Sequence, residues 1–304
     1  LSGLKTQLRK VQPDFSEKKF GYGGFIRLDH IPDTCRAKMM RDDGRFFREI
    51  EDNCWDGDAR LRDCDRDGVD VQVLSTIPVM FSYWTKPKDG LDVARFLNDE
   101  LARVCAKHPS RFVGLGTLPL QDPQLAVEEL RRCMRDLGMK GVQIGSHVEF
   151  ARDGVSTHWN RSDAALFPVF AEAERLGAAV FVHPWDMLGQ DKMTKYWLPW
   201  LVGMPMEASL ALCSLIFGGV LERLPSLRVC CAHGGGAFAG TFGRIQHGFD
   251  ARPDLVAVDN ARAPSAYAGK FFVDSLVHDP RALRFIVDTF GDDAICLGSD
   301  YPFP

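Results

Sequence analysis

The sequence predicts an α/β protein with a parallel sheet at its core, because short apolar runs alternate with helical segments from residue 69 onward. Strands are expected at 69–74, 112–115, 142–144, 178–182, 229–232, 271–273 and 295–297. Repeated strand–helix units build either an α/β barrel or a doubly wound sheet. The sequence has no G-x-G-x-x-G after a first strand and no G-x-x-x-x-G-K-[ST], which argues against the nucleotide-binding folds.

Segments with helical apolar spacing separate these strands. Pro123 lies in the first turn of one segment and Gly138 follows its end, as expected for the two ends of a helix. Helices are expected at 56–67, 91–106, 123–137, 163–176, 207–224, after the glycines at 234–236, and at 282–290. A barrel needs an eighth strand, which we expect to be missing or to lie within residues 1–11.

The composition excludes several classes of protein. A chain of 304 residues suits one large α/β domain or two modest ones. A net charge of −4 and the absence of a basic run predict that the chain does not bind nucleic acid. No apolar run approaches the roughly 20 residues of a membrane span, and no signal peptide is present. Nine scattered cysteines without C-x-x-C indicate reduced thiols, and therefore a cytoplasmic protein.

Three potential metal ligands directly follow predicted strands. His183 ends the strand at 178–182, His233 follows the strand at 229–232, and Asp300 follows the last strand. The carboxyl ends of parallel strands meet at one mouth of a barrel, where active sites form. Imidazole and carboxylate are ligands of catalytic zinc and similar divalent ions. Singly, either histidine could be a packed side chain and Asp300 a helix cap. Together they favour one shared site.

Other polar residues are less specific. Arg48 follows two phenylalanines and Arg244 lies on the helix after the glycines; arginine binds carboxylates bidentately, but surface arginines are common. His147 and His278 lie near strand ends and remain open as supports of the site. The remaining histidines are interpreted as surface or packing residues: His30, His108, His158 and His247.

Long motifs along the chain carry a resemblance to a known family. They are FGYGG (20–24), NCWD (53–56), PVMFSYW (78–84), VGLGTLPLQ (113–121), GVQIGSH (141–147), FVHPWDM (181–187), KYWLPWLVGMP (195–205), AHGGGAF (232–238), LVHDP (276–280) and LGSDYPFP (297–304). From about residue 20 to 304 the chain resembles the 2-amino-3-carboxymuconate-6-semialdehyde decarboxylases of the metal-dependent amidohydrolase superfamily.

The resemblance implies a distorted (β/α)₈ TIM-like barrel of the amidohydrolase type. It implies a single domain over residues 1–304 with a small inserted lobe at about 12–50. It also implies one zinc ion, held by an HxH pair on the first strand, by His183 and by Asp300. His233 would be the catalytic base beside the metal-bound water. No nucleotide or redox cofactor is implied.

The same resemblance implies the substrate and the assembly. Arg48 and Arg244 would bind the carboxylates of a small dicarboxylate semialdehyde, with Arg244 reaching in from the neighbouring subunit of a homodimer. Phe47, Trp185 and Phe303 would also line the substrate site. The implied reaction is non-oxidative decarboxylation to 2-aminomuconate 6-semialdehyde in the kynurenine pathway of tryptophan catabolism. It would limit flux to quinolinate and NAD.

The amino-terminal region departs from the family pattern. The HxH pair would fall near residues 5–7, which are Lys, Thr and Gln, and no histidine precedes His30. We therefore expect the first strand and the helices after the eighth strand to be missing. One alternative is a metal-deficient paralogue or incomplete chain, inactive alone, that acts by dimerising with active subunits. Another is a different decarboxylase or hydrolase of the superfamily.

Overall fold

The computed structural model describes residues 27–40, 44–152 and 155–303. These residues form a seven-stranded parallel sheet, a three-stranded antiparallel sheet and a two-stranded hairpin. The predicted first strand at 1–11, the positions that match the HxH pair and the first motif at 20–24 lie outside the described residues.

The parallel sheet contains all seven strands that the sequence predicts. They are β4 (Gln72–Leu74), β5 (Phe112–Thr117), β6 (Gly141–Ile144), β9 (Ala179–Val182), β10 (Arg228–Cys231), β11 (Phe272–Asp274) and β12 (Ile295–Cys296). Neighbours in the sheet follow chain order, and each neighbouring pair is parallel. This arrangement confirms the α/β, TIM-like architecture, and it brings the carboxyl ends of all these strands to one side.

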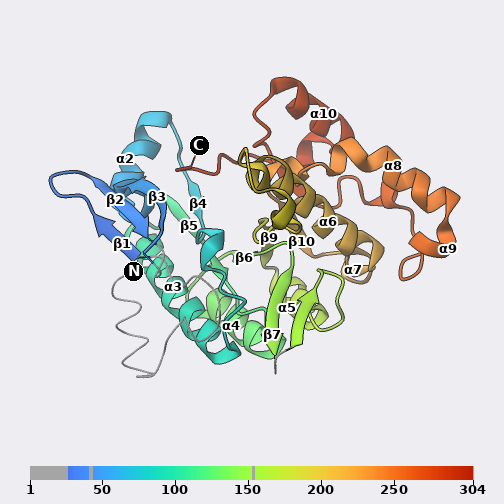
Figure 1. Ribbon diagram of the computed structural model, residues 1–304, viewed down its shortest axis with the longest axis horizontal. Coiled ribbons are helices and arrows are strands. Elements are labelled where there is room, and N and C mark those ends of the chain that lie inside the picture. The colour runs from blue at the N-terminus through green and yellow to red at the C-terminus, as the bar shows by residue number, and fades with distance from the viewer. Residues whose placement is uncertain (1–26, 41–43, 153–154, 304) are drawn as a thin grey trace.

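Helices cross between the strands and cover the outer face of the sheet (Figure 1). The larger ones are α2 (Gly57–Asp67), α3 (Pro87–Lys107), α4 (Pro123–Arg135), α5 (Phe167–Leu176), α6 (Met204–Phe217), α8 (Phe238–Ala251) and α10 (Pro280–Phe290). The helix predicted at 163–176 begins only at Phe167. The helix predicted at 207–224 is divided, because Gly219 adopts a positive φ of 66° before α7 (Val220–Arg223). A short helix, α9 (Pro253–Val256), follows α8.

The main core lies between the sheet and these helices. Val180 and Val182 of β9 alternate with Phe181 and are almost completely buried, as are Leu212 and Leu215 of α6. Burying a side chain of this size stabilises the fold by about 1.5–3 kcal/mol. The packing therefore holds β9 and β10, whose ends carry the two histidines, in a rigid frame.

One helical stretch is more apolar than the sequence analysis expected. Pro199–Phe217 spans 19 residues and is long and apolar enough to cross a membrane, by length and composition alone. Half of its most apolar part is buried inside the molecule, as in the core helix of a globular protein. Leu212 and Leu215 supply part of that buried face.

Strand β4 is shorter than predicted. The alternating valines indicate a strand from residue 69, but pairing with β5 begins at Gln72, and Val71 and Val73 are 54% and 57% exposed. The guanidinium of Arg111 binds the carbonyls of Val69 and Asp70, at 2.9 and 2.7 Å, so that these groups do not join the ladder. Within the described residues β4 is an edge of the sheet, which leaves its valines exposed.

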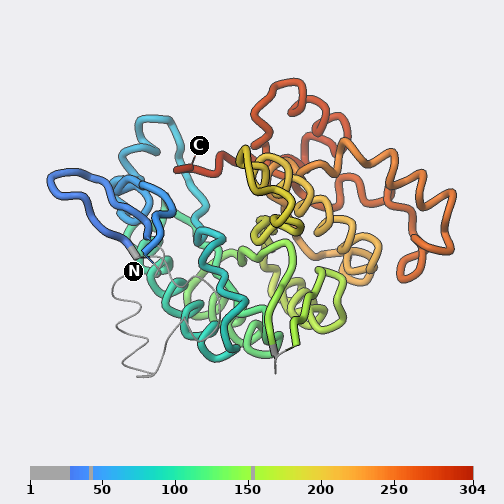
Figure 2. The backbone as a smooth tube through the Cα atoms, viewed as in Figure 1, coloured from blue at the N-terminus to red at the C-terminus, as the bar shows by residue number. Residues whose placement is uncertain are grey.

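A small lobe precedes the main sheet. Strands β1 (Arg27–His30), β2 (Arg36–Met40) and β3 (Phe46–Glu51) pair antiparallel and pack on a second apolar cluster that contains Met39 and Ile50. This lobe occupies the described part of the predicted insertion. Figure 2 shows the carboxyl-terminal segment returning towards the lobe, and Phe303 packs against the same cluster.

The hairpin was not predicted from the sequence. Strands β7 (Val148–Arg152) and β8 (Val155–Trp159) pair antiparallel directly after β6. Phe150 and Trp159 make an edge-to-face contact at 4.7 Å between ring centroids, and Val148 is buried in the main core. Aromatic pairs of this kind add stability beyond their buried area.

Candidate active site

Three side chains converge at the carboxyl ends of the strands. His183 follows β9, His233 follows β10, and Asp300 lies four residues beyond β12. One ligand atom of each lies within 4.8 Å of those of the other two. Nε2 of His183 is 3.6 Å from Oδ1 of Asp300, and Nε2 of His233 is 3.9 Å from Oδ2 of the same carboxylate. The structure thus brings together the three residues that the sequence placed in one site.

His183 has the geometry of a metal ligand. Its Nδ1 lies 2.9 Å from the carbonyl oxygen of Pro184, which accepts a hydrogen bond and leaves Nε2 with a free lone pair. Among the described residues this Nε2 is buried without a hydrogen-bond partner. A buried polar atom without a partner costs free energy. A divalent cation between Nε2 and Asp300 would remove that cost, so the residues fit such an ion.

His233 is held as a neutral base. Burial, followed by the nearby charge of His183, lowers its pKa to about 4, although Asp300 acts in the opposite direction. The two imidazole rings meet edge to face, with centroids 4.8 Å apart. His233 adopts a φ of 59°, unusual for a residue with a side chain, and such backbone conformations concentrate at functional sites. At neutral pH the imidazole can therefore accept a proton.

Asp300 stays ionised despite its surroundings. Burial raises the pKa of its carboxyl, but the nearby His183, with the charges of His233 and Arg48, lowers this pKa further than burial raises it. A carboxylate at this position supplies the negative charge that a divalent cation needs.

Arg48 and Phe47 of the lobe lie with Phe303 of the carboxyl-terminal segment near Asp300. The guanidinium of Arg48 lies over the Phe303 ring, 4.7 Å from its centroid, a cation–π contact. Phe47 and Phe303 belong to the same apolar cluster. Arg48 and Phe303 also line a cavity of about 230 Å³. The structure therefore joins β3 to the segment that carries Asp300.

The other two predicted substrate residues are placed differently. Trp185 lies two residues after His183 and is half-buried against the main core. Arg244 lies on an exposed part of α8, and it forms no ion pair with any residue of the described chain. The substrate-binding role of each stays a prediction.

Asp274 was missed in the sequence analysis. Its Oδ1 accepts hydrogen bonds from the backbone amides of Gly234, at 2.9 Å, and Leu276, at 3.1 Å. Gly234 follows His233 and has a φ of 63°. Asp274 thus holds the backbone that presents the histidine. The available signal was its position directly after a predicted strand, which is also the position of His183.

The structure shows what surrounds His147 and His278, the two histidines whose role the sequence left open. His278 lies close enough to His233 for its charge to lower the pKa of that imidazole. His147 is buried, and its Nδ1 lies 2.9 Å from Oε2 of Glu207. His108 contacts Asp58 at 2.8 Å, which confirms its interpretation as a packing residue.

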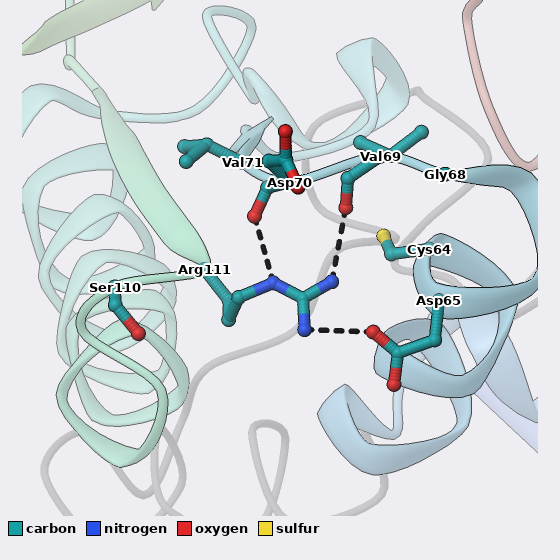
Figure 3. Close-up of a pocket in the computed structure, with 8 residues that line it drawn as sticks. All are labelled: Cys64, Asp65, Gly68, Val69, Asp70, Val71, Ser110 and Arg111. Carbon is teal, nitrogen blue, oxygen red and sulfur yellow. Dashed lines mark hydrogen bonds and ion pairs between the residues drawn. The ribbon is translucent and has the colours of Figure 1, made fainter.

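A larger cavity, of about 420 Å³, lies away from these residues (Figure 3). It surrounds Arg111 at the amino ends of β4 and β5, opposite to the ends that carry the histidines. The guanidinium is occupied by the carbonyls of Val69 and Asp70 and by Asp65, whose Oδ1 is 2.7 Å away. This cavity is part of the connection between α2 and β4.

Comparison with known proteins identifies the family of the chain. The family model described as amidohydrolase matches residues 30–304. The 2-amino-3-carboxymuconate-6-semialdehyde decarboxylase of Dictyostelium discoideum is 57% identical over 297 residues, which cover 98% of this chain and 80% of that protein. The protein of the same name from Caenorhabditis elegans is 43% identical over 339 residues, which cover 98% and 84%.

A solved structure shows the same fold with a metal. The dihydroxybenzoic acid decarboxylase from Polaromonas, with bound manganese and the inhibitor 2-nitroresorcinol, superposes with a TM-score of 0.73. It is 26% identical, and the match covers 81% of this chain and 75% of that one. The chain belongs to the amidohydrolase family. Within that family its relatives are decarboxylases, which makes it a carboxy-lyase.

Proposed function

We propose that the chain catalyses the zinc-dependent, non-oxidative decarboxylation of 2-amino-3-carboxymuconate 6-semialdehyde to 2-aminomuconate 6-semialdehyde. The proposal rests on the two relatives named for this substrate. The observation that carries the chemistry is the buried, unpartnered Nε2 of His183 facing Asp300 beside a neutral His233, within the part of the chain that the structure describes. In tryptophan catabolism this reaction limits flux to quinolinate and NAD.

His183 and Asp300 would hold the metal ion. Zinc is proposed because imidazole and carboxylate are its usual ligands in catalytic sites. When bound, a divalent ion supplies Lewis-acid stabilisation of developing negative charge.

The residues of the chain perform the remaining steps. Loss of CO₂ breaks one carbon–carbon bond, and the carbon that loses the carboxyl group must receive a proton. His233, neutral at pH 7, takes up a proton from solvent at Nε2 and delivers it to that carbon, so that the reaction consumes one solvent proton and releases CO₂. Arg48 binds a carboxylate of the substrate, and its stacking on Phe303 fixes the guanidinium plane. Phe47 and Trp185 complete the walls of the substrate-binding site.

We also propose that the protein is a homodimer in which Arg244 enters the partner's site. Support comes from an exposed apolar surface over the stretch that leads into α6. It comprises Tyr196, Trp197, Leu201, Val202, Met206 and Leu210, which are 46–82% exposed. Exposed patches of this kind mark interaction sites. The helix α8, which carries Arg244, packs against α6 and therefore lies beside this surface.

A cytoplasmic location is part of the proposal. All nine cysteines are free thiols, including the exposed Cys35 and Cys296, which suits a reducing compartment. Fractionation of cells that express the tagged protein tests this location.

The activity is tested by following the near-ultraviolet absorbance of the substrate with purified, zinc-loaded protein. We expect turnover, and a large rise in KM for Arg48→Ala and Arg244→Ala. Arg284→Ala is the matched control, because Arg284 is exposed on α10. Unchanged KM in both variants would indicate another decarboxylase or hydrolase of the superfamily. No turnover by a version that carries an HxH-bearing amino-terminal strand contradicts the proposal.

A further inference from the structure

The hairpin carries a second group of metal-binding side chains. His147, Glu149 and His158 each offer one ligand atom within 4.8 Å of those of the other two. None of them belongs to the group around His183. We propose that these three residues form a second site for a divalent transition-metal ion, separate from the active site.

The backbone places the three side chains on one face. Glu149 of β7 and His158 of β8 are direct partners in the antiparallel register. Side chains of such a pair lie about 4.5–5.5 Å apart at Cβ. His147 lies in the bend directly before β7, two residues from Glu149. The rings of His147 and His158 stack, with centroids 4.8 Å apart.

Each histidine has one nitrogen engaged and one available. His147 makes its polar contacts through Nδ1, which donates to Oε2 of Glu207 at 2.9 Å. His158 uses Nε2, which lies 3.2 Å from Oδ1 of Asn160. The lone pairs therefore remain on Nε2 of His147 and Nδ1 of His158. A carboxylate that fixes the tautomer of a histidine is the usual outer partner of a metal ligand.

Glu207 is itself firmly anchored. Its Oε2 also accepts a hydrogen bond from Ser146 at 2.6 Å, and its Oε1 accepts one from the backbone amide of Leu188 at 2.9 Å. Glu207 and His147 are both almost completely buried. His147 is therefore a preformed ligand, held at the end of β6 by α6.

Glu149 and His158 supply the adjustable part of the site. Both are exposed, and Glu149 has no hydrogen bond or ion pair with any described residue. Metal–ligand bonds of about 2.0–2.2 Å require the three atoms to move closer together than 4.8 Å, which two exposed side chains can do. Two imidazoles and one carboxylate select Zn²⁺, Ni²⁺ or Cu²⁺ over Mg²⁺ and Ca²⁺.

Metal counting tests the site directly. We compare zinc bound per chain, after dialysis against Zn²⁺, in the full protein and in the double variant Glu149→Gln/His158→Asn. The variant is expected to bind one zinc fewer per chain and to keep its decarboxylase turnover within about twofold. His247→Asn, which removes an exposed histidine from α8, is the matched control and should bind as much zinc as the unmodified protein.

A spectroscopic arm identifies the ligands. With Cu²⁺ as the probe, electron paramagnetic resonance should show a two-nitrogen signal that becomes a one-nitrogen signal in His158→Asn. Circular dichroism checks that both variants fold. Equal zinc content and an unchanged copper signal in the folded double variant would overturn the proposal. Neither readout depends on the substrate, so the result is independent of the proposed function.

Discussion

At the residue scale, the chemistry depends on small backbone groups that orient each imidazole. The carbonyl of Pro184 accepts a hydrogen bond from Nδ1 of His183, which leaves Nε2 available for a cation. Asp274 orients His233 through the backbone, because it accepts a hydrogen bond from the amide of Gly234, the next residue. Burial raises the pKa of Asp274, whereas hydrogen bonds from the backbone amides of Gly234, His233 and Leu276 lower it less than burial raises it.

Asp274→Ala should reduce kcat by about tenfold to a hundredfold with little change in KM, because two backbone amides lose their acceptor at about 1–3 kcal/mol each. Asp274→Asn keeps an oxygen acceptor and should recover most of the rate. Steady-state kinetics of both variants provide the measurement. Equal losses in the two variants would mean that the negative charge matters more than the hydrogen bonds.

Arg161 is a buried cation without a hydrogen-bond partner in the described chain. Its three side-chain nitrogens lack partners, and burial lowers its pKa to about 10, although Tyr83 and Glu207 act in the opposite direction. A basic group whose folded pKa is lowered favours the unfolded state while it remains protonated. The charge therefore reduces stability at neutral pH.

Arg161→Met should raise the free energy of unfolding by about 1–4 kcal/mol, because a methionine of similar length removes the buried charge. Denaturant unfolding measures the change. Arg161→Ala is the control for volume, and it should gain less because it leaves a cavity. A less stable methionine variant would show that the charge has a stabilising partner.

At the scale of elements, a buried carboxylate ties α4 to α5. Nε of Arg131 lies 2.6 Å from Oε1 of Glu172, and Nε of Arg175 lies 2.8 Å from Oε2. Hydrogen bonds from Arg175 and then Arg131 lower the pKa of Glu172 to about 2. The carboxylate is 8% exposed, whereas its partners are about half exposed. Solvent screening therefore reduces the strength of the pair.

Glu172→Gln should lower the free energy of unfolding by about 1–3 kcal/mol at pH 7. The folded pKa lies below the ordinary value, so the stabilisation is present above about pH 4.5 and disappears as the pH falls towards 2. The difference in Tm between variant and unmodified protein should therefore narrow from pH 5 to pH 3. Glu100→Gln, which removes an exposed ion pair on α3, should change Tm little at any pH. A difference in Tm between Glu172→Gln and the unmodified protein that does not change with pH contradicts this account.

The sequence predicted some of these elements well, for physical reasons. Strand β9 is apolar because helices cover it, and such runs are visible in a single sequence. The hairpin was missed although Asp153-Gly154, a dipeptide typical of hairpin turns, separates its two strands in the sequence, because the exposed polar residues Glu149 and His158 make its apolar pattern weak. By contrast, the sequence placed His233 in the site, because this histidine directly follows an apolar strand. The contact of Arg48 with Phe303 joins residues far apart in the chain, so only a resemblance could suggest that they share a site.

At the scale of the whole molecule, the proposed dimer can be tested by mixing two inactive proteins. Arg244→Ala lacks the arginine, and His233→Ala lacks the base. If Arg244 acts in the partner's site, a mixed dimer has one site with both residues. We therefore expect mixing, after mild dissociation, to restore up to about a quarter of the unmodified activity, since half of the dimers are mixed and each has one complete site.

Size-exclusion chromatography confirms that the subunits exchange. Leu201→Glu, placed in the exposed apolar surface, should yield monomers and abolish the recovery. Exchange without any regained activity would show that Arg244 serves its own subunit.

The order of the strands has a consequence for synthesis. Each strand of the sheet pairs with the one made just before it, so the frame can grow as the chain leaves the ribosome. The proposed active site, however, combines Arg48 from the lobe with Asp300 from beyond the last strand. A nascent chain therefore lacks the complete proposed active site until residue 300 has been synthesised. Premature termination products have no complete centre with which to act on the substrate.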